Sequence, residues 1–250
     1  MEKRLKSHPA ASRLQLQAAL SPHGLVLRGG FVPGLADAVP NLADGRPPAV
    51  LWLVGVVGSA FWPQFKASTF YQDGLPDPLD RWSAAIAHAL AKAWGGRALL
   101  PSERIEGPQG QPSYHPFQRW ASRAEPLQPS PLMLRMHPEH GPWHAYRFAL
   151  ALPSVVSQDL ASATPIPVAD ICANCAGQPC LHTCPVQAFT GSAYRIDACA
   201  SHLHSPLGQP CMAQGCLARR ACPVAPELRY SAEHAAFHMR AFAGVHPQRP

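Results

Sequence analysis

The sequence predicts an α+β protein in which a mixed α/β region is followed by a smaller, loop-rich region built around cysteines. Three observations predict this class. Apolar runs with strand and helix periodicity fill the first part of the chain. All eight cysteines of the 250 residues lie between Cys172 and Cys222. The 29 prolines, each fixing φ and removing a backbone donor, favour irregular connections. We expect two domains, residues 1–160 and 161–250, joined by a proline-rich linker at 153–169.

The first region contains the elements with the clearest signals. Leu25–Phe31 and Val50–Val57 are predicted as strands, and the second is apolar on both faces, as in the centre of a sheet. Asp77 followed by Pro78 predicts the start of a helix, since Asp suits the N-cap and Pro the first turn. This helix is expected to end at Gly95-Gly96 and to bury one stripe of side chains: Trp82, Ile86, Leu90 and Ala93.

A β-hairpin is predicted before the linker. Leu132–Met136 and Tyr146–Leu152 alternate with period two, and the segment 137–143 between them has the composition of a tight loop. Weaker signals predict three further elements: a strand at Arg97–Leu100, a helix within Tyr114–Ala124, and a terminal helix at Ser231–Phe242 that stops at Gly244.

The cysteines form two sets of four, and a Cys-Pro step closes each set. They read Cys172-x2-Cys175-x4-Cys180-x3-Cys184-Pro185 and Cys199…Cys211-x4-Cys216-x5-Cys222-Pro223. This is the pattern of a two-cluster ferredoxin, in which three close cysteines hold one [4Fe–4S] cluster and the cysteine before proline ligates the other. The pattern predicts two ligand sets: Cys172, Cys175, Cys180 and Cys222 for the first cluster, and Cys184, Cys199, Cys211 and Cys216 for the second.

Other uses of the cysteines stay open at this point. Two tetrahedral zinc sites would also take eight cysteines, although the Cys-Pro steps and most spacings fit zinc less well. Disulfides are a third reading, less expected in the cytoplasm. The x4 and x5 gaps depart from the usual x2 and x3, so one site could be degenerate or hold another cluster type. The histidines of this region are expected to be solvated loop residues: His182, His202 and His204.

The formal net charge of +6 permits an acidic partner. Arg195, Arg219 and Arg220 face one acid, Asp197, within the cysteine region, and they could raise a cluster potential, dock an acidic electron donor, or simply be solvated. Two oxidised clusters of about −2 each would lower the net charge to about +2. The basic residues are dispersed and lack interleaved aromatics, so nucleic-acid binding is not expected.

Two segments resemble known families. The region from Cys172 to Cys222, with Tyr194-Arg-Ile-Asp-Ala-Cys199 at its centre, resembles the cluster domain of epoxyqueuosine reductases, and this resemblance implies the same ligand division. The segment His137-Pro-Glu-His-Gly-Pro-Trp143-His-Ala-Tyr-Arg147 resembles a hairpin of the cytosolic cobalamin-processing (decyanase/dealkylase) proteins, whose segment reads His-Pro-x-x-Gly-x-Trp-x-Ala-x-Arg. Together they imply a flavin-reductase-like α/β sandwich that binds a corrinoid or a flavin, followed by a ferredoxin-like domain with two [4Fe–4S] clusters.

The resemblance also marks His137, Trp143 and Arg147 as candidate cofactor-binding residues. On the residues alone, these side chains could instead pin a tight hairpin to the core.

We therefore expect an iron–sulfur electron-transfer protein. As an oxidoreductase, it would take single electrons from a ferredoxin or flavodoxin and pass them through two clusters to a cofactor or small-molecule substrate on the N-terminal domain. The alternative is a non-enzymatic ferredoxin-like carrier or assembly partner. No nucleophile or acid–base pair identifies itself, so whether the chain is an enzyme stays open, as do its catalytic residues.

A cytoplasmic protein without a membrane span is also expected. The basic N-terminus is not followed by an apolar segment of the signal-peptide type. The longest apolar stretch, Ala49–Trp62, is too short to cross a bilayer.

Overall fold

The computed structural model describes residues 11–107, 110–156, 160 and 170–247. The chain divides into two compact units. The first, called here the sheet unit, comprises residues 1–56, 60–125 and 145–165. The second, the cysteine unit, comprises residues 57–59, 126–144 and 166–250. Most of the predicted linker lies outside the described residues, and the division at residue 160 stays a prediction.

A four-stranded sheet with the strand order β1-β2-β8-β3 forms the centre of the sheet unit. β1 pairs antiparallel with β2, and β3 pairs antiparallel with β8. The prediction that Val50–Val57 is a central strand is confirmed, because it lies between two strands and all but its last residue is buried. The strands span these residues: β1 Val26–Phe31, β2 Val50–Val57, β3 Arg97–Leu99 and β8 His144–Leu152.

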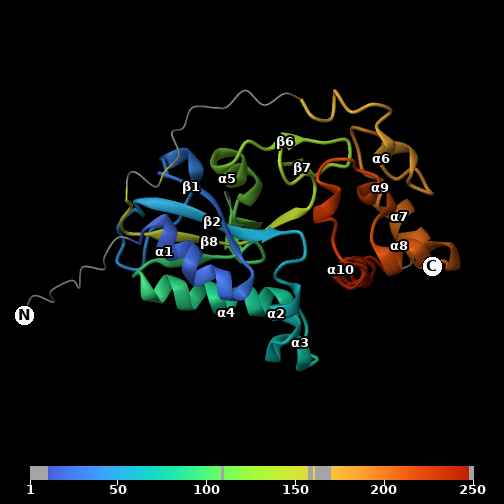
Figure 1. The fold of residues 1–250 in the computed structure, drawn as a ribbon. Helices are drawn as coiled ribbons and strands as arrows, with labels where there is room; N and C mark the ends of the chain where they lie inside the picture. The colour runs from blue at the N-terminus through green and yellow to red at the C-terminus, as the bar shows by residue number, and fades with distance from the viewer. Residues whose placement is uncertain (1–10, 108–109, 157–159, 161–169, 248–250) are drawn as a thin grey trace, which may run out of the picture. The chain divides into compact units, whose positions relative to one another are not determined.

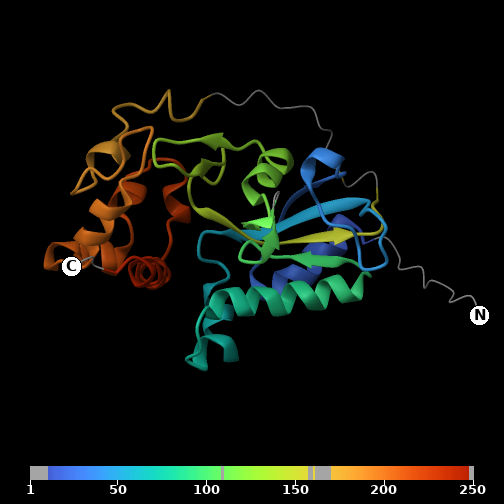
Figure 2. The same cartoon turned by 180° about the vertical axis from the view of Figure 1, so that it is seen from behind.

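Helices cover both sides of this sheet. α1 (Arg13–Leu20) and α4 (Pro78–Ala93) lie on one side, and α5 (Phe117–Ala124) lies on the other (Figures 1 and 2). The predicted helix at Pro78 is confirmed as α4, with Trp82 and Ile86 buried as expected, although Ala93 is exposed. Two short helices and a small hairpin complete the unit: α2 (Trp62–Lys66), α3 (Thr69–Gln72), β4 (Arg104–Glu106) and β5 (Pro112–Tyr114).

The cysteine unit consists mainly of short helices and turns (Figure 1). The predicted terminal helix is present as α10, which begins one residue later than predicted, because Ser231 lies at the N-cap and its hydroxyl accepts the N–H of His234. It continues past Gly244, which lies outside the left-handed region that would end it there. The elements span these residues: β6 Gln128–Pro129, β7 Arg135–Met136, α6 Pro179–His182, α7 Ile196–Leu203, α8 Gln209–Gln214, α9 Leu217–Arg220 and α10 Ala232–Val245.

The predicted hairpin between Leu132–Met136 and Tyr146–Leu152 is wrong. β7 pairs with β6, whereas β8 belongs to the four-stranded sheet. Met133 has a φ of 58°, which interrupts the extended backbone that period-two alternation requires. The tight loop itself is present, since His137 and Gly141 exchange backbone hydrogen bonds of 3.1 and 2.9 Å.

The fold thus combines helices with open sheets, as the predicted α+β class requires. In the described part of the chain, no helix has the length and apolar character needed to cross a membrane.

Candidate functional site

The first of two cysteine-lined cavities lies where a loop, α6 and the segment after α9 meet in the cysteine unit. The cysteines lining it are those predicted for the first cluster: Cys172, Cys175, Cys180 and Cys222. Asp170 shapes the loop, because its carboxylate accepts the backbone N–H groups of Cys172 and Ala173 at 3.1 and 2.9 Å. Gln178, in the left-handed region at a φ of 38°, turns the chain into α6. Leu132 and Met136 add apolar surface to the wall.

The second cavity is built from successive short helices. The cysteines lining it are those predicted for the second cluster: Cys184, Cys199, Cys211 and Cys216. Three of them lie in α7, in α8 and at the N-cap of α9. The N–H of Ala188 donates to Cys184 Sγ at 3.2 Å, and the hydroxyl of Tyr194 donates to the sulfur of Cys199. Each cavity thus combines three cysteines of one motif with the Cys-Pro cysteine of the other.

The spacing of the sulfurs bears on the kind of group that fits. A tetrahedral zinc ion with Zn–S bonds of about 2.3 Å brings its sulfurs to about 3.8 Å from one another. All eight cysteines lie in the described residues, and none of them forms a disulfide. Within the described part of the chain, no three of their sulfurs lie mutually within 4.8 Å, a spacing met only by His137, Glu139 and His140. The cysteine sulfurs of each set therefore lie farther apart than the ligands of one zinc ion, as the corner ligands of a multi-iron cluster do.

Burial raises the pKa of thiols in both cavities. The pKa of Cys172 rises to about 11, first through burial and then through the nearby sulfurs of Cys180 and Cys222. Burial also raises the pKa of Cys216 to about 11, against a hydrogen bond from the backbone N–H of Arg219. Such thiols stay protonated at neutral pH, whereas a bound metal deprotonates its thiol ligands outright. Metal binding at these sites would therefore release protons.

A histidine provides a further test of fit in the second cavity. His202 lines this cavity, and its Nε2 atom is buried with no hydrogen-bond partner among the described residues. A buried polar atom of this kind normally meets a partner, and an ion or bound group is one such partner. The expectation that His202 is an ordinary solvated loop residue is therefore wrong. A group with acceptor atoms bound among the four cysteines would satisfy it, and the inorganic sulfides of a cluster are such acceptors.

Two of the three candidate cofactor-binding residues lie in the cysteine unit, and protein groups engage both. Trp143 is buried, and its Nε1 donates to the carbonyl of Val224 at 3.1 Å. His137 is also buried, and its Nδ1 accepts the N–H groups of Glu139 and His140 at 3.1 and 3.3 Å.

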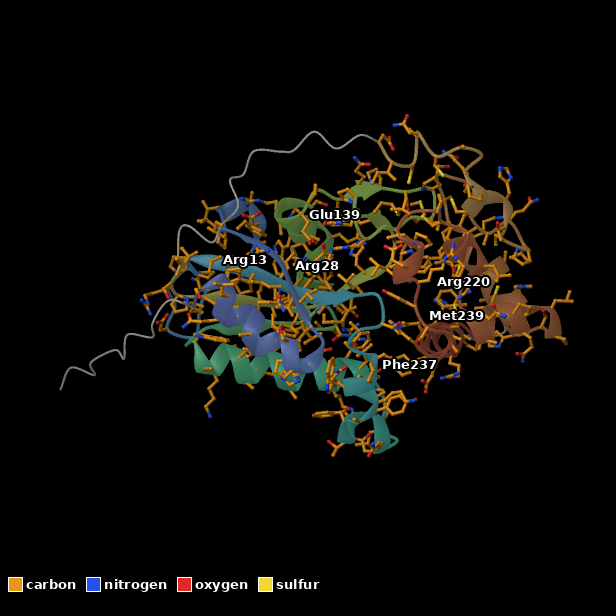
Figure 3. All side chains as sticks on the ribbon, viewed as in Figure 1. Arg13, Arg28, Glu139, Arg220, Phe237 and Met239 are labelled. Atoms are coloured by element: carbon orange, nitrogen blue, oxygen red, sulfur yellow. The ribbon has the colours of Figure 1, made fainter. Side chains whose placement is uncertain are left out.

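The loop cluster of His137, Glu139 (labelled in Figure 3) and His140 is not arranged around one metal ion. The imidazole rings of His137 and His140 stack at 4.2 Å with an interplanar angle of 11°. Imidazole lone pairs lie in the ring plane, so two nearly parallel rings cannot direct them at a common point. The stack instead stiffens the loop.

Arg147, the third candidate, lies on β8 in the sheet unit. Its guanidinium donates to Asp80 at 2.5 Å and to Ser83 Oγ at 3.2 Å, which joins the strand to α4. The structure does not bring Arg147 together with His137 and Trp143 within one unit. A role for these three residues in binding a cofactor stays a prediction.

No protein-family model matches the chain. No curated protein matches it either. Among solved structures, the C. elegans B12-trafficking protein CblC, a homologue of human MMACHC, is 15% identical with a TM-score of 0.50. The match covers 91% of this chain and 90% of that one. The chain shares the fold of CblC.

Two epoxyqueuosine reductase structures are also similar to the chain. One contains an epoxyqueuosine-modified tRNA-Tyr stem loop, with 15% identity, a TM-score of 0.40, and coverage of 90% of this chain and 71% of that one. The other, from Bacillus subtilis, has 17% identity, a TM-score of 0.38, and coverage of 89% and 62%.

Proposed function

We propose that this protein is an iron–sulfur oxidoreductase whose cysteine unit holds two [4Fe–4S] clusters. The observation that carries the proposal is the grouping of all eight cysteines around two cavities, with the two Cys-Pro cysteines exchanged between the motifs. When bound, each cluster supplies one-electron transfer. The electron donor is proposed to be a ferredoxin or flavodoxin, and the layout is proposed to be ferredoxin-like.

The chain's own residues would set the properties of these sites. Thiolates hold the clusters, and the apolar walls, which include Met136 in the first cavity and Phe189 and Leu203 in the second, exclude water from them. Hydrogen bonds to ligand sulfurs, such as that from the Ala188 N–H to Cys184, favour the more negative reduced state. Together these features stabilise a cluster and adjust its potential.

The sheet unit is proposed to carry the electron acceptor in a flavin-reductase-like α/β sandwich. CblC, which shares the fold, is a B12-trafficking protein, so a corrinoid is the first cofactor to test and a flavin the second. In either case, the sheet unit would bind and orient the acceptor, and the cysteine unit would deliver electrons.

Anaerobically purified protein is expected to contain about eight irons and about eight acid-labile sulfides per chain. Iron and sulfide analysis, with EPR of the dithionite-reduced protein, checks this directly. Zinc without sulfide would contradict the proposal. An absorption spectrum of the same sample tests for corrinoid or flavin, and a protein that transfers electrons but binds neither, even when they are added, would be a carrier rather than a reductase.

Tyr194→Phe is expected to lower the reduction potential of the second cluster alone. The Tyr194 hydroxyl donates to the Cys199 sulfur, and a hydrogen bond to a charged group contributes about 1.5–3 kcal/mol. Only the part of this energy that differs between the oxidised and reduced cluster moves the potential, and at about 1.4 kcal/mol per 59 mV for one electron we expect a fall of some tens of millivolts. Because Tyr194 also stacks on Phe189, the Phe variant keeps the ring contact. EPR-monitored redox titration measures both potentials, and Tyr114→Phe, at an exposed site, is the control. An unchanged second potential would refute this role.

A further inference from the structure

A third cavity of the cysteine unit adjoins the second cysteine cavity and shares Cys216 with it. It has a volume of about 60 Å³. Arg220 and Met239, both labelled in Figure 3, bring α9 and α10 to its wall. The side chains that matter for its chemistry are aromatic or basic: Trp143, Arg219, Arg220, Tyr230 and His238. The proposed electron-transfer function does not use this cavity.

Arg219 is held in place by aromatic rings. Its guanidinium carbon lies 4.4 Å from the ring centroid of Tyr230 and 5.2 Å from that of Trp143. One terminal nitrogen donates to the carbonyl of Pro142. The Nε atom is buried, yet its hydrogen has no acceptor among the described residues. A buried guanidinium donor without a partner is costly, so this N–H calls for an acceptor that the surrounding chain does not supply.

The positive charge of this wall is not balanced by acidic side chains. Arg220 donates to the carbonyl of Gln214 at 3.2 Å, which is a neutral acceptor. In the described part of the chain, no carboxylate forms an ion pair with Arg219 or Arg220. Two guanidinium groups therefore meet at one small cavity, and the charge there favours an anion.

A histidine is fixed at the same cavity through a hydrogen-bond chain. His234 on α10 is fully buried, and its Nδ1 lies 2.9 Å from Ser59 Oγ. Its Nε2 lies 3.0 Å from Nε2 of His238. Ser59 Oγ also accepts the N–H of Ser231 at 2.9 Å, which leaves its own hydrogen for His234 Nδ1. With its hydrogen on Nε2, His234 donates to His238 Nε2, which leaves the Nδ1 hydrogen of His238 as a further donor beside the two arginines.

We propose that this cavity binds a small oxyanion. In a cavity of about 60 Å³, where one water needs about 10–15 Å³, a small ion such as acetate or phosphate fits better than a large organic ligand. Both ligands present paired oxygens to a guanidinium fork, and one of those oxygens would accept the Arg219 Nε hydrogen. The rings of Trp143 and Tyr230 already hold the Arg219 guanidinium in place before the anion arrives, so little side-chain entropy is lost when the anion binds.

Calorimetric titration of anaerobically purified protein in a low-salt buffer tests the proposal, with inorganic phosphate and acetate as separate probes. We expect one site per chain for at least one of the two anions. Arg219→Gln and Arg220→Gln should each weaken binding about tenfold or more, because each removes a charge-assisted hydrogen bond. Arg240→Gln is the matched control, since Arg240 is exposed on α10 and does not line the cavity. Binding does not depend on electron transfer, so the result stands apart from the redox proposal.

Two results would overturn the assignment. One is the absence of binding by the wild-type protein with both anions up to about 10 mM. The other is unchanged affinity in the folded arginine variants, which would mean that these charges act only on the cluster beside Cys216. Because Arg219→Gln also removes the aromatic clamp, thermal unfolding checks its folding. If it is unfolded, Arg220→Gln together with His238→Asn decides the question.

Discussion

Cys222→Ser is expected to abolish the cluster of the first motif, although Cys222 lies in the second motif. Its side chain lines the first cavity beside Cys172, Cys175 and Cys180. By the same reasoning, Cys184→Ser should abolish the cluster of the second motif. A cubane that loses one of its four thiolates loses a corner ligand, so iron should fall from about eight to about four per chain in each variant. Iron analysis and EPR of the reduced proteins measure the loss.

Two ligand schemes can be distinguished: one in which each Cys-Pro cysteine binds the cluster of the other motif, and one in which each motif binds its own cluster. Variants of cysteines within each motif supply the comparison. Cys175→Ser should remove the same EPR signal as Cys222→Ser, and Cys216→Ser should remove the same signal as Cys184→Ser. Each pair lines one cavity but comes from two motifs. The opposite pairing, in which Cys222→Ser behaves like Cys216→Ser, would show that each motif fills its own cluster.

The elements predicted correctly are those whose signals are local. The all-apolar run of β2 can be recognised within a few residues, and so can Pro78 in the first turn of α4, although the Asp77 side chain makes no capping hydrogen bond. The hairpin prediction failed because strand pairing is a long-range property. The alternation in Tyr146–Leu152 correctly indicated a strand, but its partners lie far away in the chain, in β2 and β3. Nothing local showed that Met133 adopts a positive φ.

The candidate site divides in the same way. Cysteine order and the Cys-Pro steps predicted two sets of four, and the structure places those same sets around two cavities. Their role as cluster ligands stays a prediction. The side chains that surround them were not predicted to act there. Tyr194 reaches Cys199 across a turn, and the orphaned nitrogens of His202 and Arg219 arise only from tertiary burial. In the sequence, these three residues are marked only by being close to a cysteine. Most solvated residues of the region are equally close to one, so this signal does not single them out.

The sheet unit contains a buried ion pair that was not predicted from the sequence, because its arginine lies in the otherwise apolar strand β1. Arg28 on β1 (labelled in Figure 3) donates to both carboxylate oxygens of Glu125 at 2.8 and 3.0 Å, with side-chain exposures of 2% and 9%. The hydroxyl of Tyr146 on β8 donates to the same carboxylate. Burial and the charge of Glu125 raise the pKa of Tyr146, so this hydroxyl stays protonated and remains a donor. The three groups satisfy one another across two strands and the end of α5.

Arg28→Met is expected to destabilise the sheet unit by about 3–5 kcal/mol, because it leaves the Glu125 carboxylate buried without its counter-charge. Urea unfolding of the full chain, followed by tryptophan fluorescence, measures the change. The exposed pair of Arg46 and Asp44 supplies the control, and Arg46→Met should leave the urea midpoint of unfolding nearly unchanged.

The triple variant Arg28→Met, Glu125→Leu, Tyr146→Phe separates the value of the ion pair from the cost of breaking it. No charge or hydroxyl of the triad then remains buried, so most of the lost stability should return. If the triple variant is as unstable as Arg28→Met, the loss comes from packing around the Arg28 side chain and not from an unpaired charge. A loss below about 1 kcal/mol for Arg28→Met alone would show that Glu125 finds water or another donor when the arginine is gone.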